Sequence, residues 1–190
     1  MMTLRERKKA RTREALADAA LQLFAEQGFD HTTVDQIAEA ADVARRTFFR
    51  YFPSKEAAVF PDRERRLSQF RALLEQRGDG GNALDTVRTA LFELANDYME
   101  NRDRVALQQR IVESSPALLA YDSELDRDWE SAIAAALGDH EAHPDNARRR
   151  ARLQAGAIMG AVRAIFREWY ASRGQADLQA LGQEAFALLR

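Results

Sequence analysis

The residues best suited to chemistry form a basic cluster in one short stretch of the chain, residues 44–51. This stretch carries two adjacent arginines, Arg45 and Arg46, followed by Thr47. An arginine can donate two parallel hydrogen bonds to guanine, and a threonine can contact a phosphate or the methyl group of thymine. Side chains of these types on one exposed helix face would suit the major groove of double-stranded DNA.

Further polar residues flank this cluster and suit contacts with the phosphate backbone. Thr33 and Lys55 are expected at helix N-termini, where free N–H groups attract phosphate. Arg50 and Tyr51 lie at the end of the basic stretch, within reach of a flanking strand. An isolated arginine pair is more often a solvated surface charge, so the prediction depends on the elements around the pair. The predicted DNA contacts are Thr33, Ala44, Arg45, Arg46, Thr47, Arg50, Tyr51 and Lys55.

The elements that would position the cluster are two short helices joined by a tight turn. Thr33 and Gln36 have the spacing of a capping box, which predicts a helix over residues 34–38. With a second helix over residues 44–51, this is the pattern of a helix-turn-helix, whose second helix enters the major groove. Helices this short are stable only when they pack on something else. The apolar residues that can provide this packing, alongside a longer helix over residues 16–24, are Ile37, Ala38, Val43, Phe48 and Phe52.

Helical periodicity extends over the whole chain, and no stretch shows sustained alternation of apolar and polar residues. The pattern predicts an all-α protein of about nine helices, with an N-terminal three-helix DNA-binding domain and a C-terminal helical bundle. Gly28 should end the helix over residues 16–24, and Pro61 should kink or split the helix that begins at Lys55. A glycine cluster at residues 78–81 is a predicted loop. Later helices are expected at about residues 84–98, 103–113, 116–137, 144–170 and 178–189.

Composition excludes several classes of function. The chain has 190 residues, no cysteine, and 28 basic against 30 acidic side chains, for a net charge of −2. Without cysteine it has no disulfides, thiolate metal sites or cysteine nucleophiles. His140 and His143 lack a third ligand at usable spacing, so no metal site is predicted. We expect no membrane span and no signal peptide, and we find no phosphate-binding glycine loop in the sequence. We therefore expect a cytoplasmic protein that needs no cofactor and is not an enzyme.

Positive charge is concentrated at the N-terminus despite the acidic total. The first thirteen residues carry six basic side chains against one acidic side chain, Glu6. Two interpretations are open: a disordered, solubilising terminus, or an arm that follows phosphates or enters the minor groove. The basic residues are Arg5, Arg7, Lys8, Lys9, Arg11 and Arg13.

The motifs of residues 10–60 resemble the DNA-binding domain of TetR-family transcriptional regulators. The resemblance implies a homodimer that binds palindromic operator DNA and releases it when a small molecule occupies the C-terminal domain. It also implies a DNA-binding domain over residues 1–54 and a ligand-binding and dimerisation domain over residues 55–190. The motifs that carry it are Phe24, Gly28, Phe29, and residues 32–34, 37–38, 43–47 and 51–56.

Three residues depart from the pattern of the family. Asp42 stands where the family usually has glycine in the turn, although aspartate also tolerates a left-handed backbone. Arg46 replaces a small residue and adds a candidate base contact. Phe49 stands where a tyrosine commonly contacts phosphate, so that contact is not expected here.

Small residues in the predicted helix over residues 144–170 indicate a close contact with another helix. Glycine inside a helix costs about 1 kcal/mol relative to alanine, so Gly156 and Gly160 should have a packing reason. Packing within the chain is the simplest reason, whereas the family resemblance favours a four-helix dimer interface from the last two helices of each protomer. The predicted interface residues are Gly156, Gly160, Leu178, Leu181, Phe186 and Leu189.

The same resemblance implies a ligand pocket among the middle helices. Residues 46–52 and 59–62 are similar to a subgroup of the family that binds acyl-CoA-like ligands, so a small hydrophobic or acyl-type ligand is expected. For any one of the apolar candidates, a position in the ordinary core is the better interpretation. The alternative function is an all-α small-molecule carrier or enzyme with an incidental helix-turn-helix. The candidate pocket residues are Phe70, Phe92, Tyr98, Ile111, Trp129, Ile133 and Phe166.

Overall fold

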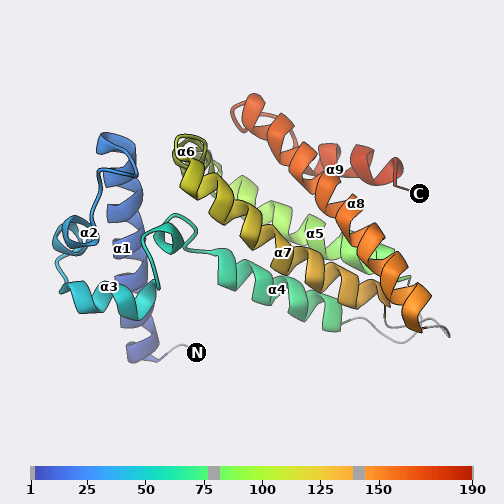
Figure 1. Cartoon of the computed structure of the whole chain (residues 1–190), viewed down its shortest axis with the longest axis horizontal. Helices are drawn as coiled ribbons and strands as arrows, with labels where there is room; N and C mark the ends of the chain where they lie inside the picture. Colours follow the sequence, from blue (N-terminus) through green and yellow to red (C-terminus); the bar gives the residue numbers. More distant parts are fainter. Residues whose placement is uncertain (1–2, 77–81, 139–143, 190) are drawn as a thin grey trace. The chain divides into compact units, whose positions relative to one another are not determined.

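The computed structural model describes residues 3–76, 82–138 and 144–189, and every regular element in these ranges is helical (Figure 1). The described part therefore confirms the prediction of an all-α protein with about nine helices. A single 3₁₀ turn, Glu56–Ala58, lies between the third and fourth α-helices. The α-helices are α1 (Leu4–Gln27), α2 (Val34–Ala40), α3 (Arg45–Tyr51), α4 (Arg63–Glu75), α5 (Ala83–Glu100), α6 (Arg102–Glu113), α7 (Pro116–Gly138), α8 (Pro144–Ala171) and α9 (Leu178–Ala187).

These elements form two compact units. The first contains the chain up to Arg63 together with Leu107–Asp122. The second contains Glu64–Ala106 and the chain from Ser123 onward. The first unit therefore extends beyond α3 and includes the end of α6 and the start of α7, a long-range association that local sequence pattern does not indicate.

The core of the first unit forms on the apolar face of α1. Leu16, Ala20 and Phe24 lie three to four residues apart along the helix and are buried, as the 3.6-residue repeat requires. Phe48 of α3 and Phe52 pack in the same cluster with their ring centroids 5.7 Å apart. The short helices α2 and α3 are thus held by packing, in agreement with the sequence prediction.

The first helix begins at Leu4, well ahead of the apolar pattern that starts at Leu16. Thr3 caps it by accepting the Glu6 N–H, and the Glu6 carboxylate accepts the Thr3 N–H. The bond from the Thr3 N–H, followed by a second one from the Thr3 hydroxyl to the same carboxylate, lowers the pKa of Glu6 from its ordinary value. At its other end α1 stops at Gly28, whose φ of +86° is readily adopted by glycine. The basic N-terminal stretch is therefore helical from residue 4, which corrects the interpretation of a disordered terminus for this part.

The segment that follows α3 is split at Pro61, as predicted. Residues 56–58 form the 3₁₀ turn, and the Ser54 hydroxyl accepts the Ala57 N–H. A further turn passes through Pro61 before α4 starts at Arg63. Proline cannot donate the N–H that a continuous helix would need.

The second unit is a bundle in which α4, α5, α7, α8 and α9 contribute to one apolar cluster. Phe70 of α4, Ile133 of α7 and Ile158 of α8 are buried together there. A smaller cluster forms around the buried indole of Trp169 near the end of α8. This helix ends before Gly174, which has a φ of +72° and closes the helix through an N–H bond to the Trp169 carbonyl oxygen.

Two predictions fall outside the described residues: the glycine loop at residues 78–81 and the His140–His143 pair. None of the helices within the described ranges has an apolar stretch long enough to cross a lipid bilayer. The described side chains also include no cluster of three or more metal-ligating residues.

Candidate nucleic-acid interface

The start of α2 is fixed by the predicted capping box. The Thr33 hydroxyl accepts the Gln36 N–H at 3.2 Å, and the Gln36 side-chain oxygen accepts the Thr33 N–H at 2.8 Å. Thr33 itself remains exposed. Its position at the helix N-terminus is therefore the one that the predicted phosphate contact needs.

The turn between α2 and α3 depends on Asp42. This residue has a φ of +52°, in the left-handed region that aspartate tolerates. The Val43 N–H then donates to the Ala38 carbonyl oxygen at 2.9 Å, which tightens the turn. Ala44 follows in an extended conformation as the N-cap of α3. Asp42 thus adopts the conformation that the usual glycine would provide.

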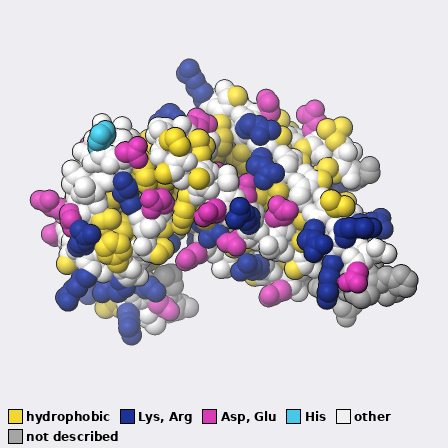
Figure 2. Space-filling view, in the orientation of Figure 1, with side chains coloured by type: hydrophobic (Ala, Val, Ile, Leu, Met, Phe, Trp, Pro, Cys, Tyr) yellow, Lys and Arg dark blue, Asp and Glu magenta, His cyan; other side chains and the backbone are white. Residues whose placement is uncertain are grey.

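The helix α3 has one buried and one exposed face. Phe48 is fully buried, whereas Arg45, Arg46 and Arg50 are exposed and Thr47 is half-buried. Phe49 is 46% exposed, so this departure from the family pattern places an apolar ring among the arginines. Figure 2 shows Lys and Arg side chains gathered at the lower left, over α3 and the N-terminal part of α1. The exposed face of α3 therefore carries the side chains that DNA recognition needs.

Arg45 is already oriented by its neighbours. Its guanidinium forms an ion pair with the Asp35 carboxylate of α2 at 2.5 Å and lies 5.7 Å from the centre of the Phe49 ring. The side chains of Arg45 and Asp35 are 59% and 62% exposed, so this pair adds little to folding stability. Its effect is to direct Arg45 along the exposed face of the helix-turn-helix.

Lys55 points inward. Its Nζ donates to the carbonyl oxygens of Phe29 at 2.7 Å and Thr32 at 3.0 Å, and lies 4.0 Å from the centre of the Phe29 ring. These contacts fix the loop between α1 and α2. Lys55 therefore has a structural role that its sequence position did not indicate, and its phosphate contact stays a prediction.

Arg13 also points inward, which corrects its assignment to the basic arm. One terminal nitrogen donates to the Tyr51 carbonyl oxygen at 2.7 Å, and the other donates to the Pro61 carbonyl oxygen at 2.9 Å. Its position three residues before Leu16, on the apolar side of α1, was the sequence signal for this orientation. The exposed basic residues of the arm are thus Arg5, Arg7, Lys8, Lys9 and Arg11.

The predicted pocket residues do not form one group. Tyr98 and Phe166 pack together in the cluster around Trp169, with their ring centroids 4.8 Å apart. Ile111 belongs to the core of the first unit. The residues that share the main cluster of the second unit are Phe70, Phe92, Trp129 and Ile133.

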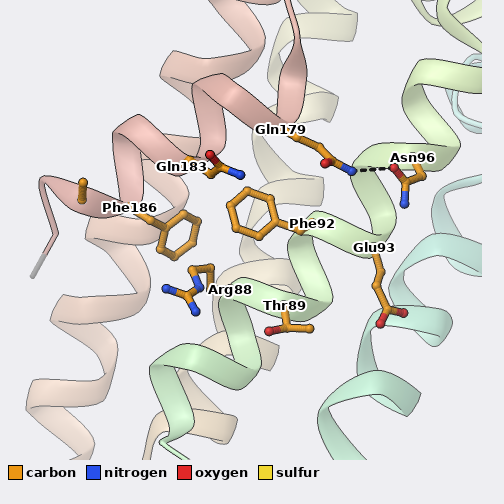
Figure 3. Close-up of a pocket in the computed structure, with 9 residues that line it drawn as sticks. Arg88, Thr89, Phe92, Glu93, Asn96, Gln179, Gln183 and Phe186 are labelled. Atoms are coloured by element: carbon orange, nitrogen blue, oxygen red, sulfur yellow. Dashed lines mark hydrogen bonds between the residues drawn. The ribbon is translucent and has the colours of Figure 1, made fainter.

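A groove of about 520 Å³ lies between α5 and α9 (Figure 3). The rings of Phe92 and Phe186 face it with their centroids 6.0 Å apart. Gly182 allows this arrangement, because a Cβ at that position would come within 2.5 Å of the Phe92 ring. The Gln179 amide donates to the Asn96 side-chain oxygen at 2.7 Å, which links α9 to α5. The lining residues are Arg88, Thr89, Phe92, Glu93, Asn96, Gln179, Gln183, Phe186 and Ala187.

The predicted dimer residues differ in orientation. Leu178 and Phe186 are buried within their own unit, and Leu181 and Leu189 are half-buried. A Cβ on Gly156 would lie 3.5 Å from the Glu130 carboxylate, whereas a Cβ on Gly160 would have no atom within 4 Å. Gly160 therefore lacks a packing reason among the described residues of its own chain.

Comparison with known proteins identifies the family of the chain. Residues 16–59 match the family described as bacterial regulatory proteins of the tetR family, and residues 82–190 match the MftR C-terminal domain. The HTH-type transcriptional regulator TcmR of Streptomyces glaucescens is 36% identical over 184 residues, which cover 94% of this chain and 81% of TcmR. The chain belongs to the TetR family of transcriptional regulators.

Solved structures of TetR-family proteins share its fold. FadR from Bacillus subtilis, solved with stearoyl-CoA, gives a TM-score of 0.64 at 20% identity and covers 93% of this chain and 96% of its own. Thermus thermophilus FadR, solved with lauroyl-CoA, gives a TM-score of 0.60 at 24% identity and covers 93% of this chain and 92% of its own. In this TetR-family chain, α2 and α3 lie within residues 16–59, the part that matches the tetR family. Because its relatives are named as transcriptional regulators, the alternative of an enzyme with an incidental helix-turn-helix loses its support.

Proposed function

We propose that the chain is a repressor that binds a palindromic operator as a homodimer and releases it when a small molecule binds the second unit. The observation that carries the proposal is the exposed basic face of α3, held in place by the buried Phe48 on its opposite side. Arg45, Arg46 and Thr47 would contact base edges. Thr33, Arg50 and Tyr51 would contact phosphates and set the register of the helix on the duplex.

A dimer would bring two copies of α3 to the same face of the duplex. Half-sites would then be separated by about 34 Å or a multiple of it. Support for the dimer comes from the outward side of α8, where Leu153 is 70% exposed. Ala157 is also exposed, and Gly160 is, among the described glycines, the one at which an added Cβ would meet no atom within 4 Å. Ala157 and Gly160 are small residues three positions apart on one face of α8, which allows a second helix to approach closely.

The ligand of this repressor would be a small hydrophobic or acyl-type molecule. The acyl-CoA ligands of the two FadR structures support this class. In the second unit, the rings of Phe92 and Phe186 form an apolar patch in a groove whose other lining side chains are mostly polar, and this patch would take the acyl chain. Ligand binding changes DNA affinity only if the ligand binds the DNA-incompetent arrangement more tightly. A regulator of this kind would act in the cytoplasm, where its operator lies.

The proposal is tested by measuring DNA affinity with fluorescence anisotropy. The duplex is the inverted repeat immediately upstream of the gene that encodes the chain. The Arg45→Ala/Arg46→Ala variant should bind this duplex at least about 100-fold more weakly, since each bidentate arginine contact contributes about 1–3 kcal/mol. The matched control is Arg148→Ala/Arg149→Ala, which removes the same charge from exposed positions of α8.

An Arg45/Arg46 variant that binds as tightly and as selectively as the parent would refute the assignment of base contacts. Addition of lauroyl-CoA, with coenzyme A as the control, should release the parent from the duplex. No release by lauroyl-CoA would contradict the acyl-type ligand.

A further inference from the structure

Arg13 joins three separate segments of the first unit through a single guanidinium. Its bonds reach Tyr51, which is 38 residues away, and Pro61, which is 48 residues away. The guanidinium carbon also lies 4.6 Å from the centre of the Phe52 ring. The planar group can make all three contacts at once because its donors form a rigid fork.

One of the two carbonyl groups that accept a hydrogen bond from Arg13 is that of Tyr51, the last residue of α3. The C-terminal carbonyls of a helix have no partner within the helix, and a cation there interacts favourably with the helix dipole. The helix has only seven residues, and its N-cap Ala44 makes no side-chain hydrogen bond. At the N-terminal end of α3, an exposed ion pair joins Arg45 to Asp35 of α2. At the C-terminal end, the hydrogen bonds of Arg13 are partly buried.

We propose that Arg13 is a positioning residue for DNA recognition: it fixes the direction of α3 by tying the end of that helix to α1 and to the turn that precedes α4. It does so without contacting DNA. Because Tyr51 and Pro61 share one guanidinium, a movement of the Pro61 turn relative to α3 must break one of the two bonds. Arg13 thus makes the direction of the recognition helix depend on the position of the chain that leads into α4. The inference rests on the proposed DNA-binding function.

Arg11 provides the matched control, because it lies on the same helix two residues earlier and is exposed. Neutralising a phosphate contact weakens binding to all sequences and reduces the slope of log K against log salt by about 1. Misdirecting α3 instead removes base contacts, so operator affinity falls while affinity for unrelated DNA and the salt slope are retained. A merely structural residue would lower the melting temperature and the active fraction without changing the ratio of the two affinities.

The experiment compares the parent with Arg13→Gln, Arg13→Lys and Arg11→Gln, using the upstream duplex and a scrambled duplex of equal length and composition. Active fractions come from stoichiometric titration, and folding is followed by thermal unfolding. Both Arg13 variants should lose at least about tenfold in operator affinity, the size of one directed base contact. Their affinity for the scrambled duplex should change less than about twofold, with an unchanged salt slope. Arg13→Lys should not restore binding, because one ammonium lacks the fork that reaches both carbonyls.

Three results would overturn the inference: a reduced salt slope with equal losses on both duplexes, full rescue by Arg13→Lys, or active Arg13→Gln protein with the specificity of the parent. A parent protein that binds neither duplex, or both equally, would instead refute the proposed function. The two failures are therefore distinguishable.

Discussion

At the scale of residues, Arg13 and Lys55 direct their charges at backbone carbonyl oxygens instead of at solvent. Each bridges two carbonyl groups, and each lies close to a phenylalanine ring. Hydrogen bonds from charged donors to buried backbone groups are stronger than neutral ones. These two cations therefore hold the loops around α2 and α3, whereas Arg45, Arg46 and Arg50 of α3 are exposed.

Replacing Lys55 by methionine should destabilise the first unit. The change leaves the carbonyl oxygens of Phe29 and Thr32 without their charged donor, which should cost about 2 kcal/mol. For a chain of this size that corresponds to a decrease in Tm of about 4–8 °C, measured by circular dichroism. Lys9→Met is the control, because Lys9 is exposed and should leave the Tm unchanged. Equal Tm values for Lys55→Met and the parent would contradict the structural role.

At the scale of elements, α4 and α5 are tied by a partly buried charge cluster. Asp97 of α5 accepts hydrogen bonds from Arg66 at 2.7 Å and from Arg65 at 3.0 Å, and the Arg66 side chain is 7% exposed. Burial by itself raises the pKa of Asp97, but the bonds and charges of Arg66 and Arg65 outweigh it and leave this pKa below the ordinary value of 3.8. The carboxylate is thus stabilised in its ionised form in the folded chain.

The cluster predicts a loss of stability in acid. Because Asp97 binds a proton more weakly in the folded chain than in the unfolded chain, its contribution is complete above about pH 4. The contribution is lost as the pH falls through the lowered pKa of the folded state. Urea unfolding followed by the fluorescence of Trp129 and Trp169, both in the second unit, measures this effect. Asp97→Asn should be less stable by about 3 kcal/mol at neutral pH and less sensitive to acid. An identical pH dependence in this variant would contradict the assignment.

The sequence predicts the elements whose signals are local. The capping box of Thr33, the left-handed turn at Asp42 and the split at Pro61 each depend on neighbouring residues, and the structure confirms all three. Spacing places Arg13 on the apolar side of α1, but the carbonyl groups that Arg13 and Lys55 bind are 23 to 48 residues away, so the sequence could not indicate these partners. The groove between α5 and α9 likewise joins residues 83 positions apart, such as Asn96 and Gln179.

At the scale of the whole molecule, the account requires two chains on one operator. A close contact through α8 would explain the unoccupied space around Gly160 and the exposed Leu153. In an isolated chain a Cβ at Gly160 would meet no atom within 4 Å, so a substituted side chain can leave the helix without a clash and should not disturb the fold. In a dimer packed through this face it should separate the two helices.

The variant Gly160→Glu should therefore be a monomer with the helix content of the parent. Analytical ultracentrifugation at micromolar concentration measures the assembly state, and circular dichroism measures the helix content. Its affinity for the upstream duplex should fall because the two copies of α3 are no longer linked. Substitution of the exposed Gln154 of α8 by glutamate, which adds the same single negative charge, controls for the added charge. A Gly160→Glu protein that remains a dimer would place the interface elsewhere.

The central claim is tested most directly by the number of chains bound to the upstream inverted repeat and by the dependence of binding on both half-sites. Sedimentation of a fluorescent duplex with the parent protein measures both quantities. The account predicts two chains on the intact repeat and at least about 100-fold weaker binding when one half-site is scrambled, because several base contacts are lost together. Binding of a single chain, or equal affinity for the intact and the scrambled repeat, would contradict it.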